Sequence, residues 1–93
     1  MVIGLCQIVL FLPDSGSLKN KRSILEGLRQ RVRNKFNVSV SEIGDNELWQ
    51  KARIGVAIVC NETRYANQVL SKVVEFIQAD HRLELLDYSL EMM

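Results

Sequence analysis

The sequence predicts a single α+β domain of ferredoxin-like type over residues 1–93, with element order βαββαβ, a four-stranded antiparallel sheet and two helices on one face. Ninety-three residues are enough for one hydrophobic core but not for two. Segments with strand and helix periodicity follow one another in that order. Two strand segments are apolar on both faces and two alternate, which indicates two central strands and two edge strands.

The first half of the chain contains a strand, a helix and a second strand. Residues 2–12 are apolar on both faces except at Gln7, and the cluster Pro13–Gly16 then turns the chain. Ser17 is expected to cap a helix that runs to about residue 36 with an apolar stripe at helical spacing. That stripe consists of Ile24, Leu25, Leu28, Val32 and Phe36. Residues 38–43 alternate, which predicts a strand with one face in water.

The second half repeats this pattern after a turn at residues 44–46. Residues 53–60 are β-branched and apolar, as in a central strand, and Asn61 is expected to cap a helix over residues 62–79. Residues 83–92 alternate again and predict the last strand. We expect the first and third strands to be central and parallel, and the second and fourth to lie at the edges.

Charge is distributed unevenly, although the whole chain has a formal charge of only +1. Seven basic residues lie between Ser17 and Phe36, against a single acid, Glu26. These basic residues are Lys19, Lys21, Arg22, Arg29, Arg31, Arg33 and Lys35. A chain that is almost neutral overall but charged in sectors favours directed contacts over general binding to polyanions.

The pattern of reactive residues does not predict an enzyme. The one histidine, His81, lies in a turn, so neither a Ser/His nor a Cys/His pair has a well-placed base. If their strands are parallel neighbours, Cys6 and Cys60 are offset by about four residues, or roughly 13 Å, which a disulfide cannot span. No ligand spacing indicates a metal or an iron–sulfur cluster. We therefore expect no catalytic residues and no cofactor.

Familiar nucleotide-binding patterns are incomplete. Residues 14–19 superficially resemble a phosphate loop but lack its Gly-Lys-Ser/Thr element. The RNA-recognition domain shares this strand order and stacks bases on aromatic side chains of its central strands. Because residues 53–60 contain no aromatic side chain, we do not expect base stacking on the sheet.

The first helix is the strongest candidate for a binding surface. Arg22, Arg29 and Arg33 fall on the same side of its apolar stripe. Arg33 lies near the C-terminus of the helix, where the helix dipole alone accounts for a cation. Lys19, Lys21 and Arg22 lie in the first turns, where the dipole disfavours cations and free N–H groups favour an anion. The predicted anion- or RNA-binding site comprises Lys19, Lys21, Arg22, Arg29 and Arg33. A solvated basic face is the alternative interpretation.

Two further features predict contacts with partners. Trp49 is interpreted either as a contact for a base or a partner protein, or as a cover for the end of the core. The first strand is apolar on both faces, but helices cover only one. We expect the chain to form a homodimer through these uncovered side chains of the sheet, face to face or edge to edge. The alternative is that the Trp49 hairpin and the C-terminus fold over this face.

Several segments resemble the YlxP-like family of small bacterial proteins of unknown function. These segments are Ser17–Arg22, Phe36–Asp45, Leu48–Ala52 and Gly55–Ala57, and the likeness covers nearly the whole chain. The resemblance implies a ferredoxin-like fold and a gene placed among those for transcription elongation, translation initiation and ribosome maturation. That neighbourhood associates the family with RNA or the ribosome, without a mechanism or catalytic residues. Family members often carry more charge on the first strand than this chain, which has Val9 and Phe11 there.

Two functions follow as hypotheses. The first is an accessory module that binds ribosomal RNA or a ribosomal protein through the basic helix. The second is a dimeric protein-interaction domain, or a sensor of a small anionic ligand, without nucleic-acid binding. No apolar run reaches the roughly 18–20 residues of a membrane helix, and the apolar start lacks signal-peptide features, so we expect a cytoplasmic protein without membrane contact.

Overall fold

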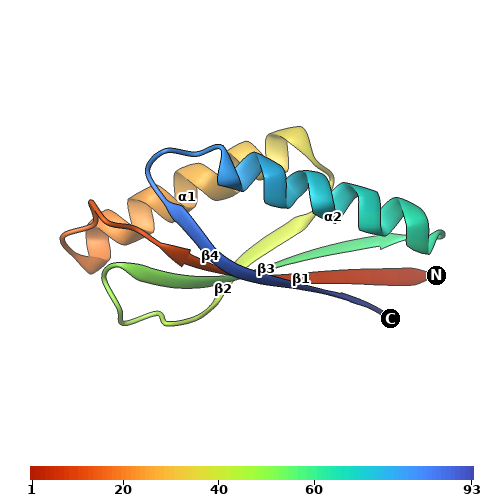
Figure 1. The fold of residues 1–93 in the computed structure, drawn as a ribbon, viewed down its shortest axis with the longest axis horizontal. Helices are drawn as coiled ribbons and strands as arrows, with labels where there is room; N and C mark the ends of the chain where they lie inside the picture. Colours follow the sequence, from red (N-terminus) through yellow and green to blue (C-terminus); the bar gives the residue numbers. More distant parts are fainter.

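The computed structural model describes all 93 residues and confirms the predicted element order (Figure 1). The strands are β1 (Val2–Phe11), β2 (Ser39–Gly44), β3 (Lys51–Cys60) and β4 (Glu84–Met92), and the helices are α1 (Leu18–Lys35) and α2 (Thr63–Gln78). The sheet has the order β2-β3-β1-β4, and every neighbouring pair is antiparallel. Both helices lie on the same face of the sheet, so the architecture is the predicted ferredoxin-like α+β fold (Figure 1). Neither helix combines the length and hydrophobicity needed to cross a membrane.

The central strands β1 and β3 are antiparallel, which confirms the antiparallel sheet of the predicted fold class, whereas the separate expectation that these two strands are parallel is wrong. The crossover through α1 gives β2 the direction of β1, and the hairpin that follows β2 reverses the chain again. In the resulting register Val2 pairs with Cys60 and Cys6 pairs with Val56. The two cysteines therefore stay about four residues apart along the ladder, or roughly 13 Å, and both are free thiols.

The start of α1 agrees with the sequence, and the start of α2 does not. Ser17 caps α1, and its hydroxyl accepts a hydrogen bond of 3.0 Å from the backbone N–H of Asn20. The cap position of α2 is Glu62, whose side chain makes no capping hydrogen bond. Because the first helical residue is Thr63, Asn61 lies one position before the cap and cannot fill that role.

The core lies between the helices and one face of the sheet. Alternate residues of β1 face the helices and are buried, namely Cys6, Ile8 and Leu10. α2 contributes Ala66, Leu70, Val73 and Ile77 to the same core. The helix approaches β1 closely at Gly4, where a Cβ atom would lie only 3.0 Å from Cδ1 of Leu70 and 3.2 Å from Cβ of Ala66. The other set of β1 side chains lies on the face without helices.

Candidate functional site

A groove runs between α1 and the outer edge of β2, the strand at one side of the sheet. It consists of two adjoining depressions of about 500 Å³ each, which share Arg29 and Val40 as lining residues. Polar side chains in the first depression are Arg29, Arg33, Asn37 and Ser39. Those in the second are Arg22, Glu26, Arg29, Ser41 and Glu42.

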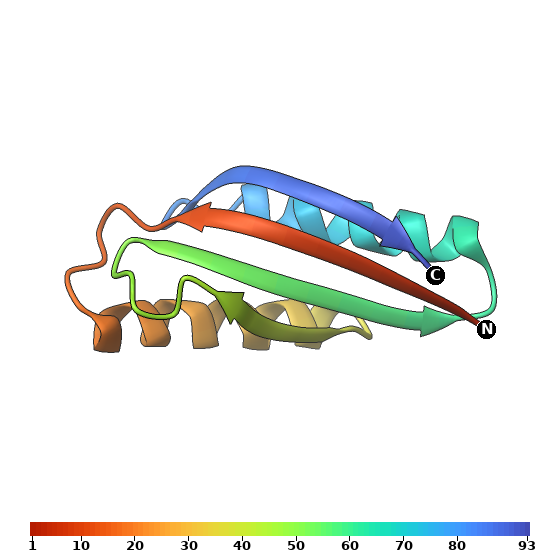
Figure 2. The ribbon, with the colours of Figure 1, turned by 90° about the horizontal axis from the view of Figure 1, so that it is seen from below.

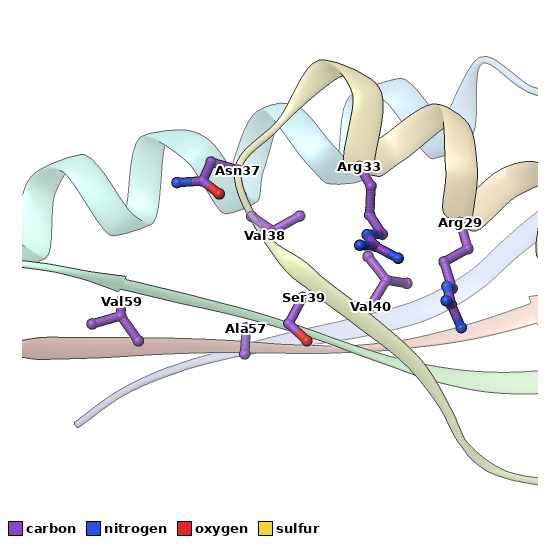
Figure 3. A pocket seen from close by; sticks show the side chains of 8 residues that line it. All are labelled: Arg29, Arg33, Asn37, Val38, Ser39, Val40, Ala57 and Val59. Atoms are coloured by element: carbon purple, nitrogen blue, oxygen red, sulfur yellow. The ribbon is translucent and has the colours of Figure 1, made fainter.

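The spacing of the arginines in α1 explains why they line one groove. Arg29 follows Arg22 by two helical turns, and Arg33 follows Arg29 by about one turn, so all three lie on one side of the helix. The buried side chains of Leu28 and Val32 hold the adjacent face of α1 against the sheet. As a result the side chains of Arg29 and Arg33 extend from the helix towards β2 (Figure 3), and Arg22 lines the adjoining depression.

Most of this positive charge is not neutralised within the chain. Arg22 and Arg33 are exposed and form no ion pair. The side chain of Arg29 is 41% exposed and lies 3.9 Å from a carboxylate oxygen of Glu26. Its Nε is buried without an acceptor. The groove therefore offers guanidinium donors that lack strong partners of their own.

Lys21 is not part of this surface, contrary to the prediction from the sequence. Its side chain is only 1% exposed, and Nζ donates a 2.6 Å hydrogen bond to the backbone carbonyl of Asp45. Nζ also lies 2.9 Å from Oε2 of Glu42. The helical spacing contains a signal for this, because Lys21 precedes Leu25 and Leu28 by four and seven residues and so shares their apolar stripe.

The N-terminal turn of α1 does not bring the predicted cluster together. Lys19 is exposed but lines neither depression. The N–H of Asn20, which would help to bind an anion, is already bonded to Ser17. Of the three basic residues predicted at this end, only Arg22 reaches the groove. The structure thus moves the centre of the basic surface from the first turns of α1 to its middle and C-terminal half.

Trp49 lies in the loop between β2 and β3 and is 57% exposed. It does not cover the end of the core, so that interpretation is wrong. Instead it lines a shallow depression of about 400 Å³ together with Phe11, Leu48 and Lys51. A contact between Trp49 and a partner stays a prediction.

Other titratable groups have structural roles. Asp80 accepts hydrogen bonds from Arg82 and from Arg31, which connects α1 to the turn before β4. The hydrogen bond from Arg82 is the main cause that holds the pKa of Asp80 below its usual value. Burial raises the pKa of Cys6 to about 11, which makes this thiol a poor nucleophile at neutral pH. No group of three or more His, Cys, Asp or Glu side chains is arranged to hold a metal ion.

Comparison with known proteins identifies the family. A family model described as "Protein of unknown function (DUF503)" matches residues 3–90. The chain belongs to this family. It is also 39% identical over 83 residues to the "Uncharacterized protein YlxP" of Bacillus subtilis (strain 168), a match that spans 89% of this chain and 90% of that protein. These matches confirm the resemblance to the YlxP-like family, whose description names no activity.

Proposed function

We propose that this protein is an accessory RNA-binding protein of the ribosome, and that it contacts phosphates through the groove between α1 and β2. The observation that carries the proposal is the row formed by Arg22, Arg29 and Arg33 along this groove. Of these three arginines only Arg29 forms an ion pair, and its contact with Glu26 is long and exposed to solvent.

The donors in the groove suit a nucleic-acid backbone. Guanidinium groups bind phosphate through two parallel N–H donors, and charge-assisted bonds of this kind are about twice as strong as neutral ones. The side chains of Asn37, Ser39 and Ser41 add neutral donors on the β2 side of the groove. In protein–nucleic acid complexes, arginine, asparagine and serine side chains commonly contact phosphate and sugar.

The composition of the groove favours contact with the RNA backbone, with little sequence preference. No aromatic side chain lines either depression, so the groove has no stacking platform for bases. Glu26 and Glu42 lie in the second depression, and Glu42 is engaged by Lys21. A chain of phosphates along the row of arginines is the arrangement that uses all three positive charges. The placement on the ribosome rests on the gene neighbourhood that the family resemblance implies.

The test compares two double variants with the same loss of charge. Arg22→Gln/Arg33→Gln removes two exposed arginines of the groove, and Arg64→Gln/Lys72→Gln removes two exposed cations of α2. Binding to a fluorescent single-stranded RNA is measured by anisotropy at several salt concentrations, and binding to purified ribosomal subunits is measured by co-sedimentation. We expect the groove variant to bind more weakly and to lose about 1.4 from the slope of log K against log salt, since each phosphate contact contributes about 0.7.

The control variant is expected to retain the affinity and the salt slope of the wild type. Equal losses of RNA affinity in both variants would indicate unspecific electrostatic attraction. Unchanged RNA affinity in both variants would show that the groove does not bind RNA. Binding of an acidic peptide, with no affinity for RNA or for the subunits, would overturn the proposal in favour of a protein partner along the edge of β2.

A further inference from the structure

The face of the sheet without helices adjoins the groove at Ala57 and Val59, which also line the first depression, but it lies apart from the row of arginines that carries the proposed function. Figure 2 views the molecule from this side, with the strands in front of both helices. The half-buried apolar residues that β1 places here are Ile3, Leu5, Val9 and Phe11. Val59 of β3 and Ile43 of β2 add apolar surface and are 66% and 49% exposed. The C-terminal segment pairs beside β1 as strand β4 and does not fold over this face, whereas the hairpin reaches its end at Phe11, where Trp49 lines a shallow depression.

Opposite charges flank the apolar stripe in two successive rows. In one row Val9 pairs with Arg53 of β3 on one side and with Asp87 of β4 on the other. In the next row Phe11 lies between Lys51 of β3 and Glu84 of β4. None of these four charged residues forms an ion pair within the chain. The members of each row lie two strands apart, about 9.5 Å between their backbones, with an apolar side chain of β1 between them.

A polar residue interrupts the stripe at its centre. Gln7 is exposed in the middle of β1 and pairs with Gly55 on one side and Ser89 on the other. A carboxamide has both donors and an acceptor, so two glutamine side chains can hydrogen-bond to each other reciprocally. A single polar residue at the centre of an apolar contact sets the register in which two copies meet.

We propose that this face binds a second copy of the same chain, with a two-fold axis that runs along β1. Such an axis places β1 on β1 and β3 of one subunit over β4 of its partner. Arg53 then faces Asp87 of the partner subunit, Lys51 faces Glu84 of the partner subunit, and Gln7 faces Gln7 of the partner subunit. Each charged pair occurs twice, because a two-fold contact is the same for both subunits. Packed sheets usually cross at about 30°, and the charged side chains are long enough to bridge the sideways displacement that this angle produces between facing strands.

The relief of the face agrees with this packing. Gly55 and Ala57 carry little or no side chain, so they leave a depression of about 290 Å³ over β3. In the two-fold arrangement β4 of the partner lies above this depression. The aliphatic part of Arg53 lies beside Gly44, where a Cβ atom would come within 3.2 Å of its Cδ. This position of Arg53 leaves the apolar stripe of β1 free for the contact.

Charge reversal tests the arrangement, with sedimentation velocity as the readout and circular dichroism as the check on folding. We expect the wild type to form a concentration-dependent dimer, and we expect Arg53→Glu and Asp87→Arg each to weaken it at least about tenfold by placing like charges together. An equimolar mixture of these two variants should form a heterodimer, because each subunit then meets an opposite charge at both contacts. Val9→Asp should abolish the dimer, and Arg64→Glu on α2 serves as a control that leaves it unchanged.

The heterodimer distinguishes this contact from an effect on the stability of the single subunit, which mixing would not repair. A wild type that remains monomeric across the micromolar range would overturn the proposal, as would single variants that dimerise like the wild type. So would a mixture without heterodimers. RNA binding by the groove is measured separately, so the failure of either proposal can be recognised without the other.

Discussion

The ammonium group of Lys21 in α1 lies 2.9 Å from a carboxylate oxygen of Glu42 in β2, although the lysine side chain is almost completely buried. The same Nζ donates to the carbonyl of Asp45, a residue in the left-handed region with φ of 59°. One cation therefore connects the first helix to the end of β2 and to the turn that follows it.

Replacement of Lys21 tests whether this connection is structural. We expect Lys21→Met to lower the free energy of unfolding by about 2–4 kcal/mol, because it leaves the Glu42 carboxylate and the Asp45 carbonyl without their donor. Urea denaturation measures this change. The matched control is Lys19→Met at an exposed position, whose free energy of unfolding should stay within about 0.5 kcal/mol of the wild-type value. RNA affinity of the folded variant should stay at the wild-type level. A variant that is as stable as the wild type but binds RNA poorly would restore Lys21 to the binding surface.

The interaction of Asp80 with Arg82 and Arg31 predicts a pH dependence of stability. Because the pKa of Asp80 is lower in the folded state than its usual value of 3.8, its contribution is present above about pH 4 and is lost as the pH falls through the lowered pKa. We expect Asp80→Asn to destabilise the protein by about 1–2 kcal/mol at pH 7, less than a buried charged pair because both arginines are partly exposed.

This difference should shrink progressively below about pH 4 in urea denaturation. Asp14→Asn in the exposed turn after β1 is the control, since Asp14 forms no side-chain hydrogen bond or ion pair. A deficit of Asp80→Asn that stays constant down to pH 2.5 would contradict an ionised Asp80 as its source.

The two thiols are expected to differ in reactivity. Cys6 is buried in the core, and burial raises its pKa to about 11, while Cys60 is only half-buried at the end of β3. At pH 8, Cys6 of the folded protein should react with iodoacetamide at least about 100-fold more slowly than the same residue in urea. Mass spectrometry of timed samples measures this ratio. Modification of Cys6 at the rate of the unfolded chain would show that the core opens readily at β1.

Any side chain at Gly4 is expected to lower the stability of the fold. A methyl group there meets atoms of Ile58 and Leu70 at 3.0 Å and of Ala66 at 3.2 Å. Gly4→Ala should therefore cost about 1–3 kcal/mol of unfolding free energy through overpacking between β1 and α2. Gly16→Ala has no atom within 4 Å of the added methyl and should change stability little. Equal stability of the two variants would mean that α2 can move away from the sheet.

The element order and the roles of the strands could be predicted from the sequence because they depend on local periodicity. Apolar residues at helical spacing must share one face of a helix, and alternation must divide a strand into two faces. The same logic identified the central strands and the apolar set on both faces of β1. It could not establish which set faces the helices, because both sets are apolar.

The basic surface was predicted only in part, since charge along a chain does not reveal which charges are paired. Seven basic residues of the first helical segment look alike in sequence, but the packing of α1 on the sheet buries Lys21, pairs Arg31 with Asp80 and aligns three arginines with the edge of β2. By itself the sequence determined the fold class, the central strands and the concentration of charge in the first helix. Only the tertiary structure decided how the two central strands run relative to each other and which cations remain free, because both depend on contacts between segments that are distant along the chain.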